Sequence, residues 1–273
     1  MRTLYVSDLD GTLLQSSART SQYTNNTINA LIEKGMLFSY ATARSYLTAC
    51  KVTAGLRTDI PLVVYNGAAL VDGGDGTPML KNFFGAEIEE VLEDLYANDI
   101  FPIVYAFLEG REVFSYIPSK CTPGMVTFLD SRKGDQRTHP VEDEEALGRG
   151  EIFYLTCIDS KEKLEPLYEK YRDRYHCVFQ TELYTREQWL EIMPLEASKS
   201  HAIEQLKKQL GCDRLVVFGD GRNDMDMFEA ADECYAVENA VPELKTMATA
   251  VIGSNDGDGV ARWLEQNWQG CTD

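Results

Sequence analysis

The chain has 273 residues and 44% of them are hydrophobic, so it can bury a sizeable core and is not expected to be disordered. Its formal net charge of −18 argues against nucleic acid and anionic membranes as partners, because both repel an acidic surface. A site for a small anion must therefore gather positive charge locally, from a cation, a basic side chain or backbone N–H groups.

Seven cysteines are scattered along the chain without a C-x-x-C pair, which is typical of a reduced cytosolic protein. The apolar run near the start, Leu4-Tyr5-Val6, is too short for a signal peptide. No stretch approaches the roughly 20 apolar residues of a membrane-spanning helix. We expect a soluble, cytoplasmic protein.

Both ends of the chain alternate between short apolar strands and helices. The N-terminal part is predicted to form strands at 4–6, 36–41 and 62–65, with helices at 25–34 and 44–53 between them. The C-terminal part continues the pattern, with helices at 198–210 and 223–231 and strands at 215–218, 234–237 and 250–252. This order predicts one parallel sheet with helices on its faces, a Rossmann-like α/β core.

The middle of the chain favours a different architecture. An amphipathic helix over Ile88–Leu95 is followed by paired strand-like runs and then by loops around 131–150. Further elements are predicted as a strand at 152–157, a helix at 161–171 and strands near 178–181 and 189–192. We predict an α+β domain inserted at residues 83–188, with residues 1–82 and 189–273 forming the core.

Two acidic clusters directly follow apolar strands. The first is Asp8-Leu9-Asp10-Gly11-Thr12, and the second is Gly219-Asp220-Gly221-Arg222-Asn223-Asp224. Either cluster alone would more often make a turn or cap a helix. Because the carboxyl ends of parallel strands share one edge of the sheet, both clusters are expected to meet there. Converging carboxylates need a cation among them, and dense oxygen ligands suit Mg²⁺.

Thr42 and Lys199 are two further candidates for this edge. Thr42 follows the second strand, where its hydroxyl could contact an anion, although a Thr before a helix is more often an N-cap. Lys199 begins the 198–210 helix, where a cation is slightly unfavourable for the helix dipole. A lysine there is explained if it offsets a carboxylate or holds a phosphate; in isolation it would be a surface residue.

Four features of the sequence resemble, in order and position, the four motifs of the haloacid dehalogenase (HAD) superfamily: the first acidic cluster, Thr42, Lys199 and the second acidic cluster. Asn66-Gly67-Ala68 after the third strand, with the long insertion between the second and third motifs, resembles the Cof-type branch with its type IIB (C2B) cap domain. The resemblance spans essentially the whole chain. It implies a phosphoric monoester hydrolase with Mg²⁺ as cofactor and a small phosphorylated metabolite, such as a sugar phosphate, as substrate.

The resemblance also implies a role for each motif residue. Asp8 would be the nucleophile that forms an aspartyl phosphate, and Asp10 the general acid and then the base. Mg²⁺ would be held by Asp8, the Asp10 backbone carbonyl and Asp220, with Asp224 nearby. Phosphate and substrate would be bound by Leu9, Thr42, Arg44, Lys199 and Asn223.

Two positions depart from the family pattern. Ala43 replaces the usual Gly of Thr-Gly-Arg, and Ser200 replaces the Gly that usually follows the lysine. Neither change removes a reacting group, so an active enzyme is expected. Arg44 is interpreted as a substrate or cap contact, with a plain surface arginine as the alternative.

Two other functions stay open at this point. A phosphosugar mutase would share the motifs and the cap, but it would have to protect its phosphoenzyme from water. A non-catalytic sugar-phosphate sensor is expected to lack the nucleophile or a metal carboxylate, and this chain has both. Selectivity for the substrate is assigned to the inserted domain, where Glu182, Tyr184 and Arg186 are candidates.

Overall fold

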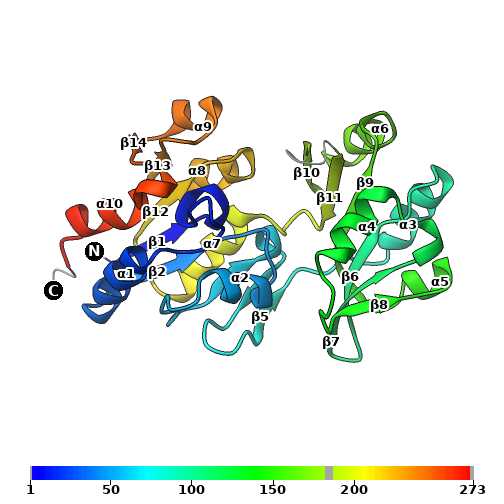
Figure 1. The fold of residues 1–273 in the computed structure, drawn as a ribbon, viewed down its shortest axis with the longest axis horizontal. Helices are drawn as coiled ribbons and strands as arrows, with labels where there is room; N and C mark the ends of the chain where they lie inside the picture. Colours follow the sequence, from blue (N-terminus) through cyan, green and yellow to red (C-terminus); the bar gives the residue numbers. More distant parts are fainter. Residues whose placement is uncertain (1, 182–186, 271–273) are drawn as a thin grey trace. The chain divides into compact units, whose positions relative to one another are not determined.

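The structure is a computed structural model that describes residues 2–181 and 187–270. The chain divides into two compact units (Figure 1). The first unit joins residues 1–81 to residues 196–273, and the second comprises residues 82–195. The selectivity candidates Glu182, Tyr184 and Arg186 lie outside the described residues.

A parallel five-stranded sheet forms the centre of the first unit, in the order β14-β13-β12-β1-β2. Its strands are β1 (Thr3–Ser7), β2 (Leu37–Tyr40), β12 (Arg214–Gly219), β13 (Glu233–Val237) and β14 (Ala250–Ile252). Leu4, Val6 and Val217 are fully buried, as expected of strands covered on both faces. Because β1 pairs with β12, segments from opposite ends of the sequence lie side by side (Figure 1).

Helices connect the strands of this sheet. They are α1 (Gln22–Glu33), α2 (Tyr46–Val52), α7 (Lys199–Gln209), α8 (Met225–Ala230), α9 (Pro242–Met247) and α10 (Gly259–Asn267). Ser21, Ser45 and Ser198 cap the first, second and seventh helices, each accepting a hydrogen bond from a backbone N–H three residues later. These caps determine where the helices begin.

The third predicted strand pairs differently from the expectation of a parallel sheet. β3 (Leu62–Val64) is antiparallel to β4 (Ala69–Val71), which pairs in turn with β5 (Pro78–Lys81). Only one parallel bridge, Ala41–Val63, connects the described part of β3 to the end of β2. The chain turns back because Tyr65, Asn66 and Gly67 have successive φ values of 53°, 51° and 96°.

The second unit contains a six-stranded sheet in the order β10-β11-β9-β6-β7-β8. The strands are β6 (Ile103–Leu108), β7 (Arg111–Tyr116), β8 (Thr138–Pro140), β9 (Glu151–Asp159), β10 (His176–Thr181) and β11 (Gln188–Met193). All neighbours are antiparallel except β7 and β8. One face packs against α3 (Ile88–Ala97) and α6 (Lys161–Tyr171) through a core that includes Leu95, Leu155 and Leu164.

Two features of the second unit differ from the expectation. The stretch 131–150 is not all loop, since it contains β8 and the short α5 (Glu144–Leu147), and α4 (Pro123–Asp130) precedes it. The unit also extends beyond residue 188, because β11 pairs with β9 and β10. Among the helices of the described residues, none is long and apolar enough to cross a bilayer.

Candidate active site

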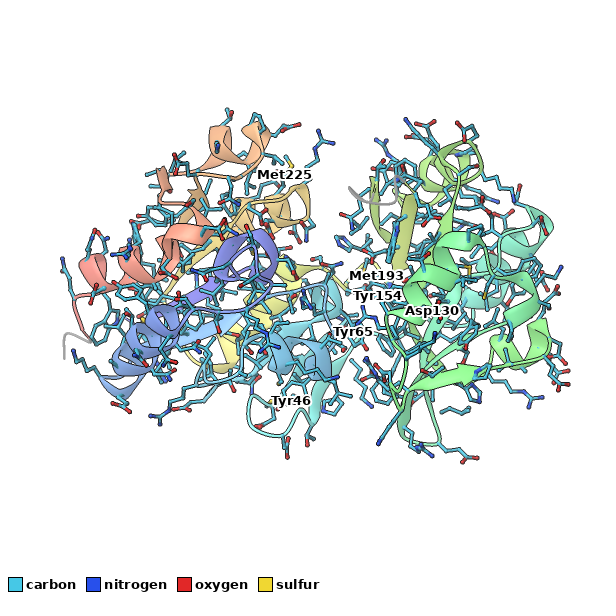
Figure 2. The ribbon with its side chains drawn as sticks, viewed as in Figure 1. Tyr46, Tyr65, Asp130, Tyr154, Met193 and Met225 are labelled. Atoms are coloured by element: carbon cyan, nitrogen blue, oxygen red, sulfur yellow. The ribbon has the colours of Figure 1, made fainter. Side chains whose placement is uncertain are left out.

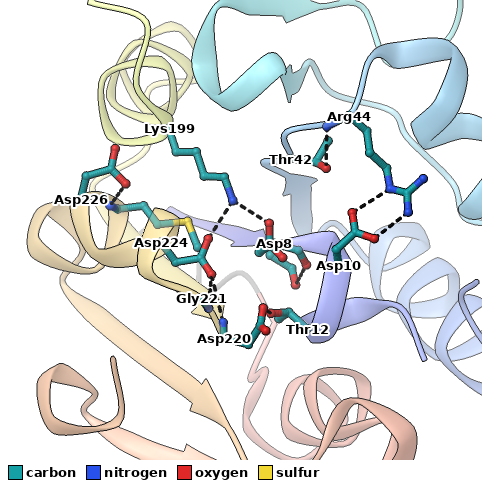
Figure 3. Close-up of polar contacts among 12 residues, drawn as sticks. Asp8, Asp10, Thr12, Thr42, Arg44, Lys199, Asp220, Gly221, Asp224 and Asp226 are labelled. Carbon is teal, nitrogen blue, oxygen red and sulfur yellow. Dashed lines mark hydrogen bonds and ion pairs between the residues drawn. The ribbon is translucent and has the colours of Figure 1, made fainter. Parts of the chain in front are cut away.

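The two acidic clusters meet because β1 and β12 end beside each other (Figure 3). The strand pairing continues to Asp8, whose backbone N–H donates to the Phe218 carbonyl at 2.9 Å. One carboxylate oxygen from each of Asp8, Asp220 and Asp224 lies within 4.8 Å of the others. Three carboxylates at this spacing can converge on a single metal ion.

Lys199 lies between two of these carboxylates. Its Nζ donates to Asp8 Oδ1 at 2.6 Å and to Asp224 Oδ1 at 2.7 Å, and its side chain is only 1% exposed (Figure 3). The lysine reaches this position from the first turn of α7, which the Ser198 side chain caps. Lys199 therefore supplies one positive charge to a group of three acids.

One ammonium cannot balance three ionised carboxylates, and the pKa values of Asp8 and Asp220 are shifted upward. Burial raises the pKa of Asp8 well above its ordinary value, and the charges of Asp224 and Asp220 oppose the lowering effect of Lys199. The pKa of Asp220 is raised to about 6, first by burial and then by the charge of Asp224. Burial lowers the pKa of Lys199, but the charges of Asp224 and Asp8 more than offset this, so its net shift is upward.

Local hydrogen bonds orient the carboxylates of the second cluster. Thr12 Oγ1 donates to Asp220 Oδ1 at 2.8 Å. Asp224 Oδ2 accepts from the backbone N–H groups of Asp220 and Gly221, both at 3.0 Å. Gly11 has a φ of +80°, and a Cβ at that position would lie 2.3 Å from Asp220 Oδ2. The first loop can approach Asp220 this closely only because residue 11 has no side chain.

Asp10 and Arg44 form a bidentate ion pair at the edge of the cluster. Arg44 Nε donates to Asp10 Oδ2 at 2.7 Å, and Nη2 donates to Oδ1 at 2.6 Å (Figure 3). The Arg44 backbone N–H donates to Thr42 Oγ1 at 3.1 Å. Because Thr42 accepts this bond and is buried, its hydroxyl hydrogen can point toward a ligand in the cluster.

The turn at 65–67 ties the Thr42 loop to the start of α7. Tyr65 N–H donates to the Arg44 carbonyl at 3.0 Å, and Asn66 N–H donates to the Thr42 carbonyl at 2.9 Å. A Cβ on Gly67 would lie 2.0 Å from the Ser198 carbonyl oxygen. The left-handed turn therefore places Thr42 and Lys199 by close backbone contact, a constraint that no residue pattern indicated.

The remaining predicted residues are adjacent to this cluster. Leu9 is buried between Asp8 and Asp10, and its carbonyl accepts from Leu14 N–H at 2.8 Å. Asn223 is half-buried in the 3-10 turn Arg222–Asp224. The binding roles of Leu9, Thr42, Arg44 and Asn223 stay predictions.

Sequence reasoning missed the parts played by Thr12 and Asp226. Thr12 orients Asp220, and its presence in the first motif was the available signal. Asp226 Oδ2 accepts from Ser200 N–H at 3.1 Å, which holds the first turn of α7 against the second acidic cluster. An acidic residue at the start of a helix is too common to indicate such a contact.

Residues 5–264 match the family of haloacid dehalogenase-like hydrolases. The chain belongs to this family. The HMP-PP phosphatase of Serratia proteamaculans is 26% identical over 98% of this chain and 96% of its own. This membership and this relative confirm three expectations from the sequence: the family, the α/β fold class, and the enzyme class, which is a phosphoric monoester hydrolase.

Solved structures support the same fold. A crystal structure from Thermotoga maritima is 26% identical, covers all of both chains and superimposes with a TM-score of 0.79. A HAD subclass IIB sugar phosphatase is 19% identical, covers 97% of this chain and 98% of its own, and has a TM-score of 0.74. At 19% identity, the similarity to this sugar phosphatase supports the fold alone.

Proposed function

We propose that this HAD-like hydrolase is an Mg²⁺-dependent phosphatase that cleaves a small phosphorylated metabolite, such as a sugar phosphate, through an aspartyl phosphate on Asp8. The observation that carries the proposal is the cluster of Asp8, Asp220 and Asp224, in which Lys199 donates to Asp8 and Asp224. Family membership supports the reaction class, and so does the similarity to a relative that is named as an HMP-PP phosphatase.

The donor set fits Mg²⁺. Three carboxylates and one lysine leave an excess of negative charge, and all the donors are hard oxygens that this ion prefers. Asp8, Asp220 and Asp224 would hold the ion together with the Asp10 backbone carbonyl. When bound, Mg²⁺ would offset the charges of the carboxylates and of the phosphoryl oxygens.

In the first step, a carboxylate oxygen of Asp8 attacks phosphorus and the bond from phosphorus to the leaving oxygen breaks. The Asp10 carboxyl gives its proton to that oxygen, so the leaving group departs as an alcohol. Lys199 and the Thr42 hydroxyl stabilise the phosphoryl oxygens as charge moves onto them. In the structure both Asp10 oxygens contact Arg44, so Asp10 must release Arg44 before it can protonate the substrate.

In the second step, the ionised Asp10 takes a proton from a water molecule, and the water oxygen attacks phosphorus. The bond to Asp8 breaks, which releases inorganic phosphate and restores the Asp8 carboxylate. A mutase would require that the aspartyl phosphate is not hydrolysed before the sugar bound beside it has been exchanged. Two assays distinguish the activities. Release of inorganic phosphate is measured with p-nitrophenyl phosphate and with sugar phosphates, and the sugar phosphates are also analysed for isomerised products.

Metal removal tests the cofactor. EDTA is expected to reduce phosphatase activity to background, because the carboxylate cluster then lacks its compensating charge, and Mg²⁺ should restore it. Ca²⁺ is the matched control, since it is larger and tolerates irregular coordination. Equal recovery with Ca²⁺ would contradict a compact Mg²⁺ site, and full activity after exhaustive chelation would contradict metal dependence altogether.

Gly11→Ala tests the close approach of the first loop to Asp220. The added methyl group would push on a carboxylate that Thr12 holds, so we expect a lower affinity for Mg²⁺ and at least a tenfold loss of kcat/KM, equivalent to about 1.4 kcal/mol. Gly211→Ala is the control in the same unit. Residue 211 also has a positive φ, of +61°, but a Cβ there would meet nothing within 4 Å.

Both glycine variants carry the conformational cost of alanine at positive φ, roughly 1 kcal/mol of stability. Only Gly11→Ala should change Mg²⁺ titrations and kcat/KM. Equal effects of the two variants on Mg²⁺ affinity would show that the Gly11–Asp220 contact has no special importance.

A further inference from the structure

The carboxyl ends of β13 and β14 lie at the same edge of the first unit's sheet as the two acidic clusters, because its five strands are parallel. Each of these two strands is followed by an asparagine. Asn239 comes two residues after β13, and Asn255 comes three residues after β14. In Figure 2, Met225 marks the start of α8, which directly follows the second acidic cluster and leads to β13.

The Asn239 side chain forms hydrogen bonds through both ends of its amide group. Its Nδ2 donates to the Gly11 carbonyl at 2.7 Å, and its Oδ1 accepts from the Asn255 backbone N–H at 3.0 Å. Asn255 is buried, and its own Nδ2 donates to the Leu14 carbonyl at 2.9 Å. The two asparagines therefore hold the first loop at two of its backbone carbonyl groups.

The carbonyl group that Asn239 holds belongs to the peptide between Gly11 and Thr12. On one side of this peptide, Gly11 packs against Asp220, since a Cβ on Gly11 would lie 2.3 Å from Asp220 Oδ2. On the other side, Thr12 Oγ1 donates to Asp220 Oδ1 at 2.8 Å (Figure 3). Both carboxylate oxygens of Asp220 thus contact the segment that Asn239 fixes.

The turn that contains Asn239 also holds the backbone of Asp220. The Val241 N–H donates to the Asp220 carbonyl at 2.9 Å. An asparagine that only shapes a turn bonds to backbone groups within that turn. The two partners of Asn239 lie instead 228 and 16 residues away in the sequence. Residues 239–241 therefore connect the first loop to the second acidic cluster.

Hydrogen bonds of this kind could also serve stability alone, and Asn29 provides that simpler case. Asn29 Nδ2 donates to the Gly55 carbonyl at 2.8 Å, and its Oδ1 accepts from the Arg57 N–H at 2.7 Å. These partners lie in the connection between α2 and β3, outside both acidic clusters. Asn29 thus makes the same pair of bonds as Asn239 in a different part of the same unit.

We propose that Asn239 is a positioning residue for the Mg²⁺ site. By fixing the peptide between Gly11 and Thr12, it holds the Asp220 carboxylate in the orientation that binds the ion. This proposal rests on the Mg²⁺-dependent phosphatase function proposed above. Residues that orient metal ligands typically contribute a factor of roughly 10–100 to metal affinity or activity. Because Asn239 acts through the first loop, its effect belongs at the lower end of that range.

Asn239→Ala is expected to raise the Mg²⁺ dissociation constant about tenfold, measured by calorimetric titration of the protein without substrate. The Mg²⁺ concentration that half-activates hydrolysis of p-nitrophenyl phosphate should rise by a similar factor. The kcat at saturating Mg²⁺ should change less than about threefold, because the reacting groups are untouched. Asn239 is exposed, so the alanine variant is expected to fold, and thermal unfolding without Mg²⁺ checks this.

Asn29→Ala is the matched control. It loses one bond to a carbonyl and one from a backbone N–H, as Asn239→Ala does, but it should leave the Mg²⁺ constant unchanged. Thr12→Val tests the route by a double-mutant cycle, since it removes the hydroxyl group that orients Asp220. In the Thr12→Val background, Asn239→Ala should weaken Mg²⁺ binding by no more than about threefold, because both changes act on the same carboxylate.

The outcomes separate this inference from the proposed function. If the wild-type protein neither binds Mg²⁺ in the titration nor releases phosphate in its presence, the proposed function fails and this inference fails with it. If the wild-type protein does both, equal Mg²⁺ constants for Asn239→Ala and Asn29→Ala would overturn the inference alone. So would a loss on Asn239→Ala that keeps its full size in the Thr12→Val background.

Discussion

Asp8→Asn is expected to lower kcat by roughly 10⁴-fold or more, because the amide cannot act as the nucleophile that forms the phosphoenzyme. The fold should survive the change. Burial and the neighbouring acids already raise the pKa of Asp8, so a neutral side chain of the same shape is tolerated there. The measurement is phosphate release with saturating Mg²⁺, combined with thermal unfolding of the same preparation.

Asp59→Asn is the matched control for Asp8→Asn. It removes the same charge from an exposed side chain of the first unit, which pairs with the exposed Arg57 at 2.6 Å. This variant should keep wild-type kcat. If Asp8→Asn retained more than about one per cent of activity in a preparation free of other phosphatases, covalent catalysis by Asp8 would be ruled out.

Lys199→Met is expected to cost about 3–5 kcal/mol of stability in the absence of divalent cations. Methionine fills a similar volume, but it leaves Asp8 and Asp224 buried without the ammonium that both contact. The folded-state pKa of Lys199 is raised, so its stabilisation is fully present below its ordinary value of 10.5 and is lost only at higher pH. The loss should therefore be seen across neutral pH.

Lys207→Met provides the comparison on the same helix. Lys207 pairs with Asp232 at 3.1 Å, but that pair is exposed, and its removal should cost no more than about 1 kcal/mol. The two variants are compared by denaturant unfolding, with and without Mg²⁺. Mg²⁺ should stabilise Lys199→Met more than wild type, because the ion offsets the acids that the lysine no longer balances. Equal stability of the two variants would contradict the charge balance proposed for the site.

Lys199→Met should also lower kcat/KM by on the order of 10²-fold or more, since the proposed mechanism assigns this ammonium to stabilise the transferring phosphoryl group. Lys207→Met should not affect turnover.

The family and the α/β fold could be predicted because each of the indicative patterns lies in a short segment of the sequence, and the separate segments agree with one another. Buried strands end in acidic turns, and parallel pairing brings the ends of β1 and β12 to one edge whatever the distance between them in the sequence. Lys199 stood out for a related reason, as a cation at a helix start where the dipole disfavours it.

Other features depend on tertiary contact and leave no such pattern. The antiparallel return at β3 and β4 follows from three left-handed residues. Asn66 and Gly67 belong to types that adopt this conformation readily, but Tyr65 does not, and no local pattern indicates that all three adopt it together. The Asp10–Arg44 pair joins two loops, and nothing in either loop specifies the other. Glu191 lies in the strand Gln188–Met193, and nothing in that run of residues reveals that its carboxyl group is buried.

The central claim, a phosphoryl group carried on Asp8, is tested most directly by trapping it. Sodium borohydride reduces an acyl phosphate to an alcohol, which would convert Asp8 to homoserine. Wild-type enzyme quenched during turnover with Mg²⁺ should show homoserine at position 8 in peptide mass spectra, and enzyme without substrate should not. Reduction at another carboxylate would contradict the mechanism. So would the absence of homoserine at position 8 when a pre-steady-state burst of the leaving group ahead of phosphate shows that the intermediate accumulates.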